Sequence, residues 1–478
     1  MRRRRAADFD VTVLGGGTAG FSAALAAVHE GARVALVEQE RRLGGDCTFY
    51  GCVPSKALIE LAGAVARGAA LAAAGILEPQ SRIDFGAVMA RQRAIVEQIA
   101  ADERDERFTD AGIEVIHGRG SFADRHTLSI DGRPIRSRSF VVAAGSHAAV
   151  PPVPGLDQVP YLTNRTIFGL VHRPERLLVL GGGAIGLELA QAFARFGSTV
   201  TVIEFAERLL PQNEPEAGVL VAKCLRGDGV ELRLGSGARS ARLNAGEIEL
   251  EVGDDVVRGD ALLVATGRAA SVAGLGLERI GTVLDRGYVK VDTRCRTSVA
   301  NVYAAGDVTG GIQLTHVAAH EGAVAGRNAA GKRARTDERV VPSVVFVDPE
   351  VARVGITEAE ALTTRRSVRT VLFPLAGVDR ARITGRTEGF IKIVTAGRPL
   401  LGRAGGGVVV GAEVVGPGAG ELIHEFALAM QTRMFAGRLA QTIHAYPTMS
   451  VAVQQAMSQL FPLGRTLVES GDHTAARG

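Results

Sequence analysis

Cys47 and Cys52 have the spacing most suggestive of chemistry in this sequence, with four residues between them. A zinc site needs a second pair of ligands after such a pair. The other two cysteines, Cys224 and Cys295, stand alone in the sequence. We expect Cys47 and Cys52 at the start of a helix that continues through Leu61, where the helix N-terminus stabilises a thiolate. The pattern therefore predicts a redox-active pair of thiols and no metal site.

Two segments of the chain share the order strand, glycine turn, helix, strand and acid. Their glycines and acids are Gly15, Gly17, Gly20 and Glu38 in the first segment and Gly181, Gly183, Gly186 and Glu204 in the second. In such a turn the glycines allow the tight bend, the approach of a pyrophosphate and the packing of helix on strand. The helix N-terminus attracts phosphates, and the acid accepts hydrogen bonds from a ribose diol. Two complete patterns in one chain predict two dinucleotide-binding domains.

The remaining sequence extends this α/β organisation. Ala144-Gly145 and Gly267 each end an apolar strand in a turn of small residues. A Pro-rich stretch at 151–154 predicts a crossing between domains, and Gly and charged residues mark a break at 331–342. Alternating apolar strands and then two helical patterns follow this break. We therefore expect an α/β protein with two Rossmann-like dinucleotide-binding domains and a C-terminal α+β domain.

The composition of the chain excludes several classes of function. The 478 residues carry a formal net charge of only +4 without a run of stacking aromatics, so we expect no nucleic-acid partner. No stretch of about 20 apolar residues is present, which predicts no membrane span. Four cysteines in so long a chain do not make a secreted disulfide scaffold. We expect a cytoplasmic protein whose N-terminal Arg run is a solvated end.

These motifs together resemble those of the pyridine nucleotide–disulfide oxidoreductases, the group of lipoamide dehydrogenase, glutathione reductase and mercuric reductase. The resemblance rests on the two glycine turns, the segment 44–56 around the cysteines, and the later Ala304-Ala305-Gly306-Asp307. It implies an FAD-binding domain at 1–150, an NAD(P)-binding domain at 151–270, a central domain at 271–341 that completes the FAD site, and a dimerisation domain at 342–478. It also implies a homodimer, in which the partner's C-terminal domain completes each active site.

The resemblance assigns catalytic roles to four residues. Cys52 is expected to face the flavin as the charge-transfer thiolate, and Cys47 to be the interchange thiol. Lys56 is expected near flavin N5, with Glu188 of the second glycine helix as its partner.

The resemblance also assigns the cofactor contacts. Glu38 is expected to hold the FAD ribose, and Asp307 the ribityl or pyrophosphate part of FAD. The remaining cofactor-binding positions are the glycines of the two turns together with Gly45, Ala144, Gly145, Gly267 and Gly306. Glu204 favours the free ribose diol of NADH, because a carboxylate repels the 2′-phosphate of NADPH. NADH is therefore the expected donor and NADPH the less favoured one.

The sequence departs from this family near its C-terminus. Disulfide reductases of the group carry an H-P-T-x-S-E segment whose His and Glu act as an acid–base pair. Here Tyr446 stands at the position of the His and Val451 at that of the Glu. A Tyr with a pKa near 10 donates a proton to a leaving thiolate less readily than a His with a pKa near 6.5. Tyr446 or the neighbouring His444 is the candidate replacement.

Mercuric reductases also place Tyr at this position, so the sequence is nearest to that branch. They also carry a C-terminal cysteine pair, however, and the last cysteine here is Cys295. We expect an enzyme that passes electrons from NAD(P)H through FAD and the Cys47–Cys52 disulfide to a disulfide or a thiol-bound metal. The alternatives are a dihydrolipoamide dehydrogenase, an NADH:quinone reductase and a redox sensor of low turnover.

Overall fold

The computed structural model describes residues 7–78, 82–398 and 400–461. The predicted solvated Arg run at the N-terminus lies outside these residues. The chain forms two compact units. The first comprises the residues up to 175 together with 240–249 and 259–338, and the second comprises 176–239, 250–258 and the residues from 339 onward. The predicted domain boundaries remain predictions.

The first unit is built on a seven-stranded sheet with the order β3-β2-β1-β6-β5-β4, in which β18 also pairs with β6. Its strands are β1 (Phe9–Leu14), β2 (Val34–Glu38), β3 (Ile113–His117), β4 (Gly120–Asp124), β5 (Thr127–Ile130), β6 (Arg133–Val142) and β18 (Val302–Ala304). β3, β2, β1, β6 and β18 are parallel, and β4 and β5 are antiparallel. The parallel strand β2 is apolar from Val34 to Val37 and buried throughout, as expected for a strand that helices cover.

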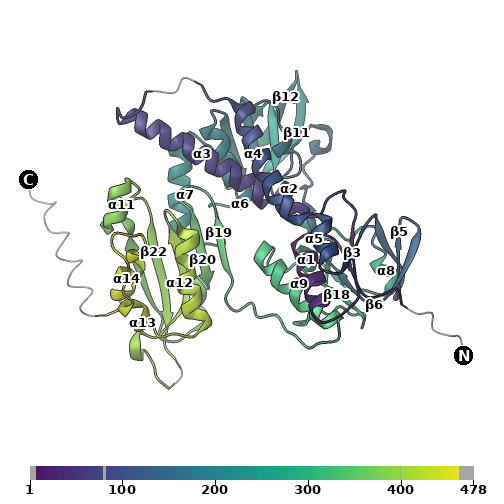
Figure 1. Cartoon of the computed structure of the whole chain (residues 1–478). Coiled ribbons are helices and arrows are strands. Elements are labelled where there is room, and N and C mark those ends of the chain that lie inside the picture. The colour runs from purple at the N-terminus through teal and green to yellow at the C-terminus, as the bar shows by residue number, and fades with distance from the viewer. Residues whose placement is uncertain (1–6, 79–81, 399, 462–478) are drawn as a thin grey trace, which may run out of the picture. The chain divides into compact units, whose positions relative to one another are not determined.

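Helices of the first unit place small residues against the sheet and against each other. They are α1 (Thr18–His29), α2 (Gly45–Tyr50), α3 (Cys52–Ala73), α4 (Phe85–Ala100), α5 (Asp105–Asp110), α8 (Leu277–Ile280) and α9 (Thr315–Ala329). α1 packs closely along α9, as Figure 1 shows. Both helices contribute buried alanines, among them Ala23, Ala27 and Ala325, to one hydrophobic core. This packing brings the start of α9, far along the chain, to the cysteine segment.

Short elements connect the larger ones in the first unit. They are β7 (Ser146–Ala148), β14 (Ala261–Val264), β15 (Arg268–Ala270), β16 (Leu284–Asp285) and β17 (Tyr288–Val289), with the 3-10 helices η1 (Ala101–Glu103), η2 (Leu156–Gln158), η3 (Ile167–Gly169) and η4 (Asp307–Thr309). β7 pairs antiparallel with β15. This pairing joins the small-residue turns at Gly145 and Gly267, which are 122 positions apart in the sequence.

The second unit begins with the other predicted dinucleotide motif. It contains β8 (Arg176–Leu180), α6 (Ala184–Arg195), β9 (Thr199–Glu204), α7 (Pro215–Gly227) and β10 (Glu231–Leu234). The three strands are parallel in the order β10-β9-β8. The strands β11 (Ala238–Asn244), β12 (Glu247–Val252) and β13 (Asp255–Gly259) follow, with residues in both units. The predicted Rossmann-like pattern is confirmed.

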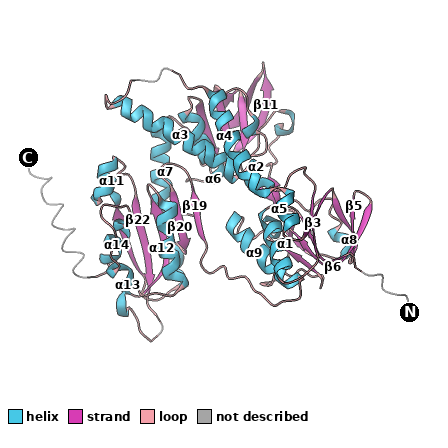
Figure 2. Ribbon diagram, in the orientation of Figure 1, coloured by secondary structure: helices cyan, strands magenta, loops and turns pink. Residues whose placement is uncertain are grey.

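The C-terminal part of the second unit is a five-stranded antiparallel sheet with the order β19-β20-β23-β22-β21. The strands are β19 (Pro342–Val345), β20 (Val351–Gly355), β21 (Arg369–Pro374), β22 (Phe390–Ala396) and β23 (Val408–Val415). The helices are α10 (Glu358–Thr364), α11 (Asp379–Thr384), α12 (Ala419–Gln431), α13 (Ala436–Gln441) and α14 (Val451–Ser458), with η5 (Leu375–Gly377) and η6 (Ala404–Gly406). α12 packs on β20 and β23, and α14 packs on β21 and β22 (Figure 2). This is the α+β domain that the sequence predicted.

Candidate active site

Cys47 and Cys52 lie on two successive helices rather than at the start of one. Cys47 belongs to the short α2, and Cys52 is the first residue of α3. Gly51 separates the helices, with φ −139° and ψ −111°. The predicted helix through Leu61 does begin at Cys52, but the prediction is wrong for Cys47, because the Gly51 conformation places Cys47 on a separate helix. Cys47 is half-buried and Cys52 is exposed.

Thr315, the first residue of α9, contacts both thiols. Its Oγ1 lies 3.3 Å from Cys52 Sγ and 3.5 Å from Cys47 Sγ. A hydrogen bond to Cys52 and burial raise the pKa of Cys47 far above its usual value, while the hydrogen bond from Thr315 lowers it. The thiols share one proton network.

Glu103 places a carboxyl group near the cysteine segment. It hydrogen-bonds to the Thr48 side chain, and burial raises the pKa of Glu103. Its Oε2 is buried, and no hydrogen-bond partner for it exists among the residues that the structure describes. The negative charge of Glu103 contributes to the raised pKa of Cys47. Glu103 lies 56 positions after Cys47, so no local signal in the sequence pointed to it.

The first glycine turn joins β1 to α1 in the first unit. Glu38 accepts a hydrogen bond from Gly16 N at 2.7 Å, which holds the acid at the turn. A side chain at Gly20 would meet Gly15 O, so only glycine lets the helix pack this closely on the turn. The N-cap residue Gly17 makes no side-chain cap, which leaves the first N–H groups of α1 to a phosphate. Gly45 Cα faces Gly17 without side chains between them, and this open backbone fits a dinucleotide.

The second glycine turn, in the second unit, repeats this geometry. Glu204 accepts hydrogen bonds from Gly182 N at 2.5 Å and from Ala206 N at 2.7 Å. A side chain at Gly186 would meet Gly181 O, as at the first turn. Gly183 is the uncapped residue before α6. Residues of both turns therefore fit the phosphates and ribose of a dinucleotide.

The other predicted cofactor residues gather around Asp307 in the first unit. Ala144 N lies close to Gly15, and Gly145 precedes Ser146. Ser146 Oγ donates to Asp307 Oδ2 at 2.5 Å. Gly306 N donates to Glu321 Oε2 at 2.6 Å, and burial raises the pKa of Glu321 to about 7. Their roles in binding FAD remain predictions.

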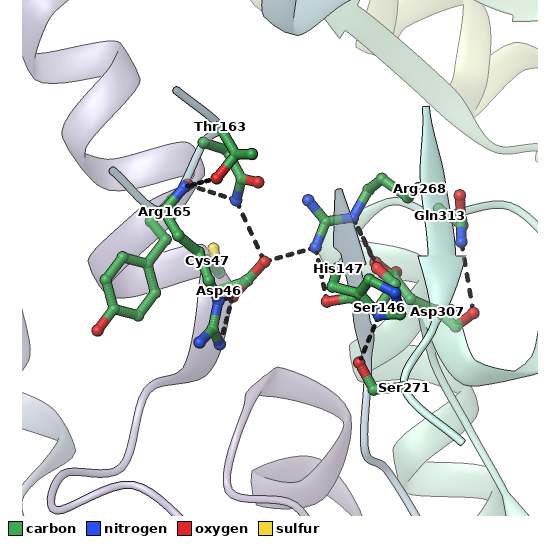
Figure 3. Close-up of polar contacts among 12 residues, drawn as sticks. Asp46, Cys47, Ser146, His147, Thr163, Arg165, Arg268, Ser271, Asp307 and Gln313 are labelled. Atoms are coloured by element: carbon green, nitrogen blue, oxygen red, sulfur yellow. Dashed lines mark hydrogen bonds and ion pairs between the residues drawn. The ribbon is translucent and has the colours of Figure 1, made fainter. Parts of the chain in front are cut away.

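Arg268, which directly follows Gly267, joins the Asp307 group to the cysteine segment. Its Nε lies 3.3 Å from Asp307 Oδ2, and its Nη2 donates to Asp46 Oδ2 at 2.5 Å. Figure 3 shows Arg268 between these two acids. Arg165 binds Asp46 from the other side at 3.0 Å. Sequence reasoning missed Asp46, Arg165 and Arg268; the Arg after the small-residue turn at Gly267 was the one available signal.

Lys56 and Glu188 belong to different units, and their predicted pairing remains a prediction. Lys56 lies on α3, one helical turn after Cys52, and is partly exposed. Glu188 is buried on α6, where its Oε1 accepts a hydrogen bond from Phe346 N at 2.8 Å. Glu188 thus sits in the second unit as a carboxylate held by backbone.

His444 and Tyr446 each have a carboxylate partner within the second unit. His444 Nε2 lies 2.9 Å from Glu425 Oε2, and its Nδ1 lies 2.9 Å from Thr442 O. Both ring nitrogens are therefore engaged. Tyr446 is 72% exposed, and its hydroxyl donates to Asp379 Oδ2 at 2.9 Å. This hydrogen bond raises the pKa of Tyr446.

The described residues offer no ready metal site and no membrane-spanning helix. Within 7–78, 82–398 and 400–461, no cluster of three or more His, Cys, Asp or Glu side chains is arranged to hold a metal ion. Over the same residues, none of the helices combines the length and the apolar character needed to cross a membrane.

Comparison with known proteins identifies the family. The family model "Pyridine nucleotide-disulphide oxidoreductase" matches residues 9–322, and the model of its dimerisation domain matches residues 341–457. A mercuric reductase of Streptomyces lividans is 36% identical over 94% of this chain and 95% of that protein. A dihydrolipoyl dehydrogenase of Chlamydia muridarum is 34% identical over 92% of this chain and 94% of that protein.

Solved structures agree with this result. LpdA from Mycobacterium tuberculosis has a TM-score of 0.85 and 30% identity, and the match covers 94% of this chain and 99% of LpdA. The Cu(II) complex of the HOCl-induced flavoprotein disulfide reductase RclA from Escherichia coli has a TM-score of 0.84 and 28% identity over 94% and 99%. The chain therefore belongs to the pyridine nucleotide–disulphide oxidoreductase family, whose members are enzymes that use FAD and NAD(P)H.

Proposed function

We propose that this enzyme uses NADH and FAD to reduce a disulfide or a thiol-bound metal ion through Cys47 and Cys52. The observation that carries the proposal is the contact of both thiols with Thr315 Oγ1 beside the first glycine turn. Bound FAD and NADH supply two-electron hydride chemistry that keeps the cysteine pair reduced. The glycines of the two turns, Glu38 and Asp307 would hold FAD and the nicotinamide nucleotide at their phosphate and sugar parts.

The chain's own residues then carry the exchange. Cys47, as a thiolate, attacks one sulfur of the acceptor disulfide, and the other acceptor sulfur leaves and takes up a proton. Cys52 next attacks Cys47 Sγ, which releases the second acceptor thiol and forms the Cys47–Cys52 disulfide. Lys56 and Glu188 are proposed to pair beside the cofactor, as the family resemblance implies. With a thiol-bound metal ion, the same two sulfurs replace the ligands of the metal.

The source of the proton narrows the choice of acceptor. His444 has both ring nitrogens engaged with Glu425 and Thr442, so it has no open nitrogen for a leaving thiolate. Tyr446 holds its proton toward Asp379. Acceptors whose leaving thiols have a low pKa, or thiol-bound metals, depend least on a general acid. This supports a mercuric-reductase-like acceptor over lipoamide, although the chain has no C-terminal cysteine pair for the usual metal relay.

A dihydrolipoamide dehydrogenase is the second candidate, because the Chlamydia relative carries that name at 34% identity. Tyr446 in place of a catalytic His argues against it. We further propose a homodimer, which the match to a dimerisation domain supports, and a cytoplasmic location. Glu204 at the second turn supports NADH over NADPH.

Anaerobic titration with NADH tests the proposal. We expect a long-wavelength absorption band, as the family resemblance implies for a Cys52 thiolate beside oxidised flavin. Cys47→Ser should abolish turnover with disulfides and thiol-bound metals and preserve any NADH:quinone turnover. Cys224→Ser is the matched control, because Cys224 is a half-buried cysteine outside the pair. Direct bleaching of the flavin without the band would contradict the cysteine mechanism and favour quinone reduction or a sensor role.

A further inference from the structure

We propose that Asp46 is a positioning residue for Cys47, which ties the cysteine-bearing helix α2 to two distant segments of the chain. The segments are 163–165 and the strand that begins at Arg268. Together with Asp46, the side chains of Asn164, Arg165 and Arg268 form what we call the Asp46 clamp. The inference deepens the proposed function, because it concerns the reactivity of the same thiol.

Helix α2 needs outside support. It has six residues, from Gly45 to Tyr50, and a helix of this length is not stable by itself in water. Its N-cap residue Gly44 makes no side-chain cap. Asp46 lies in the first turn, where a carboxylate also interacts favourably with the helix dipole. We therefore expect the Asp46 clamp to stabilise α2, because the local sequence does not.

Arg268 anchors the N-terminal end of α2. Its Nη2 donates to Asp46 Oδ2 at 2.5 Å and to Ser146 O at 3.1 Å, and its Nε donates to Ser146 Oγ at 2.6 Å. The side chains of Arg268 and Asp46 are 16% and 21% exposed, so solvent screens this pair weakly. Arg268 also pairs with Asp307, as Figure 3 shows. The position of α2 is thus coupled to a predicted FAD-binding residue.

Asn164 and Arg165 hold both ends of α2. Arg165 places Nε and Nη2 on Asp46 Oδ1 at 3.2 and 3.0 Å, and its guanidinium lies 4.8 Å from the ring centroid of Tyr50. Asn164 Nδ2 donates to Asp46 Oδ2 at 3.3 Å and to Tyr50 O at 3.0 Å. Two neighbouring residues therefore bind the first turn and the last residue of the helix that carries Cys47.

The charge of Asp46 matters as well as its contacts. It is one carboxylate between two guanidinium groups, directly next to Cys47 in the chain. Removal of the carboxylate would leave the positive charges of Arg165 and Arg268 less fully neutralised near the thiol. Nearby positive charge favours a thiolate, so the pKa of Cys47 should fall. Asp46 therefore sets both the place and the proton affinity of Cys47.

The test compares the full-length holoenzyme with Asp46→Asn and with Glu30→Gln as the matched control. Glu30 is also an acid between two cations, Arg327 at 3.0 Å and Lys332 at 3.4 Å, but it lies beyond α1. Hydrogen exchange of the amides in 45–52 reports the position of α2. Alkylation of Cys47 by iodoacetamide in dithiothreitol-reduced enzyme, mapped by mass spectrometry across pH, reports the thiol.

We expect Asp46→Asn to speed exchange in 45–52 by about tenfold and to move the alkylation midpoint of Cys47 to lower pH, with neither change in Glu30→Gln. Asp46→Glu, which keeps the charge, should retain the wild-type midpoint. Unchanged exchange would overturn the proposal. Faster exchange with an unchanged alkylation profile would also overturn it, since Asp46 would then anchor the helix without acting on Cys47.

A second set of variants covers the case in which Asp46→Asn does not fold. Arg165→Lys and Arg268→Lys keep the positive charge but lose the forked contact. Each should speed exchange in 45–52, and unchanged exchange in both would overturn the proposal. These readouts need no acceptor and no turnover. A wild-type enzyme without a long-wavelength band would therefore count against the proposed function and leave the exchange result to decide on Asp46.

Discussion

The hydroxyl of Thr315 lies 3.5 Å from the sulfur of Cys47, although 268 positions separate the two residues. The contact exists because α9 packs along α1 and presents its first residue to the cysteine segment. The hydrogen bond from this hydroxyl lowers the pKa of Cys47. The hydrogen bond with Cys52 and burial both act in the opposite direction and raise it. Thr315 thus belongs to the proton network of the thiols.

Thr315→Val should raise the pKa of Cys47, because the isosteric side chain removes a donor to the thiolate. We expect the alkylation midpoint of Cys47 to move to higher pH and the rate at pH 7 to fall roughly threefold to tenfold, as for a shift of up to about 1.4 kcal/mol. The measurement is the pH profile of alkylation in reduced enzyme. Thr109→Val, which removes a hydroxyl bonded to Asp105 O within α5, should leave the profile unchanged.

Glu204→Gln should weaken the preference for NADH over NADPH. The carboxylate sits at the end of β9, where it repels a 2′-phosphate, and the amide removes that charge. We expect the ratio of kcat/KM for NADPH to that for NADH to rise about tenfold, equal to about 1.4 kcal/mol.

Glu38→Gln provides the matched control at the first turn, since Glu38 binds Gly16 N as Glu204 binds Gly182 N. The ratio should not change in this variant, because loss of bound flavin affects both substrates equally. An unchanged ratio in Glu204→Gln would show that another residue selects the nucleotide.

Glu413 should make the C-terminal part less stable as the pH rises from about 4.5 to about 7. Burial raises the pKa of Glu413 to about 7, although Asn213 Nδ2 and Glu214 N donate to it and lower that value. Its neighbours are the carboxylate of Glu214 and the cation of Arg353. In this window the folded state binds the proton more tightly than the unfolded state, so stability falls with rising pH and is constant above it.

Glu413→Gln cannot titrate and should lack this fall. The difference in free energy of unfolding between the wild-type protein and Glu413→Gln should change by roughly 3 kcal/mol between pH 4.5 and pH 7. Far-UV circular dichroism during thermal unfolding measures it, since the chain has no Trp for fluorescence. Parallel curves for the two proteins would mean that Glu413 has an ordinary pKa in the folded state.

Ile443→Asp should dissociate the proposed homodimer. Ile443 is 93% exposed, and Leu428 and Tyr446 nearby in the sequence are 61% and 72% exposed, within the region that matches the dimerisation domain. A buried charge at such an interface is costly. Light scattering after size exclusion should show monomer for this variant and dimer for the control Val171→Asp, whose residue is 74% exposed and lies outside the dimerisation match.

The two glycine turns and their acids could be read from the sequence alone because their requirements are local. A side chain at Gly20 or Gly186 would strike the carbonyl oxygen of the residue five positions earlier. The requirement for glycine is therefore visible in the sequence itself. The same holds for β2 and β8, whose apolar runs reflect burial. The α/β fold and the C-terminal α+β domain followed from such patterns. The predicted helix holds from Cys52 through Leu61 but does not include Cys47, because Gly51 interrupts it.

The partners of the cysteines were decided by the tertiary structure. Thr315 reaches Cys47 through the packing of α9 on α1, and Arg268 reaches Asp46 through the pairing of β15 with β7. Contacts between residues so far apart in the chain produce no periodicity or spacing in the sequence, so a single sequence cannot predict them. The sequence by itself therefore predicted which thiols, glycines and acids form the candidate site, because local backbone geometry and spacing constrain them. Only the folded chain decided which side chains contact Cys47 and Asp46, because these contacts depend on distance in space and not on position in the sequence.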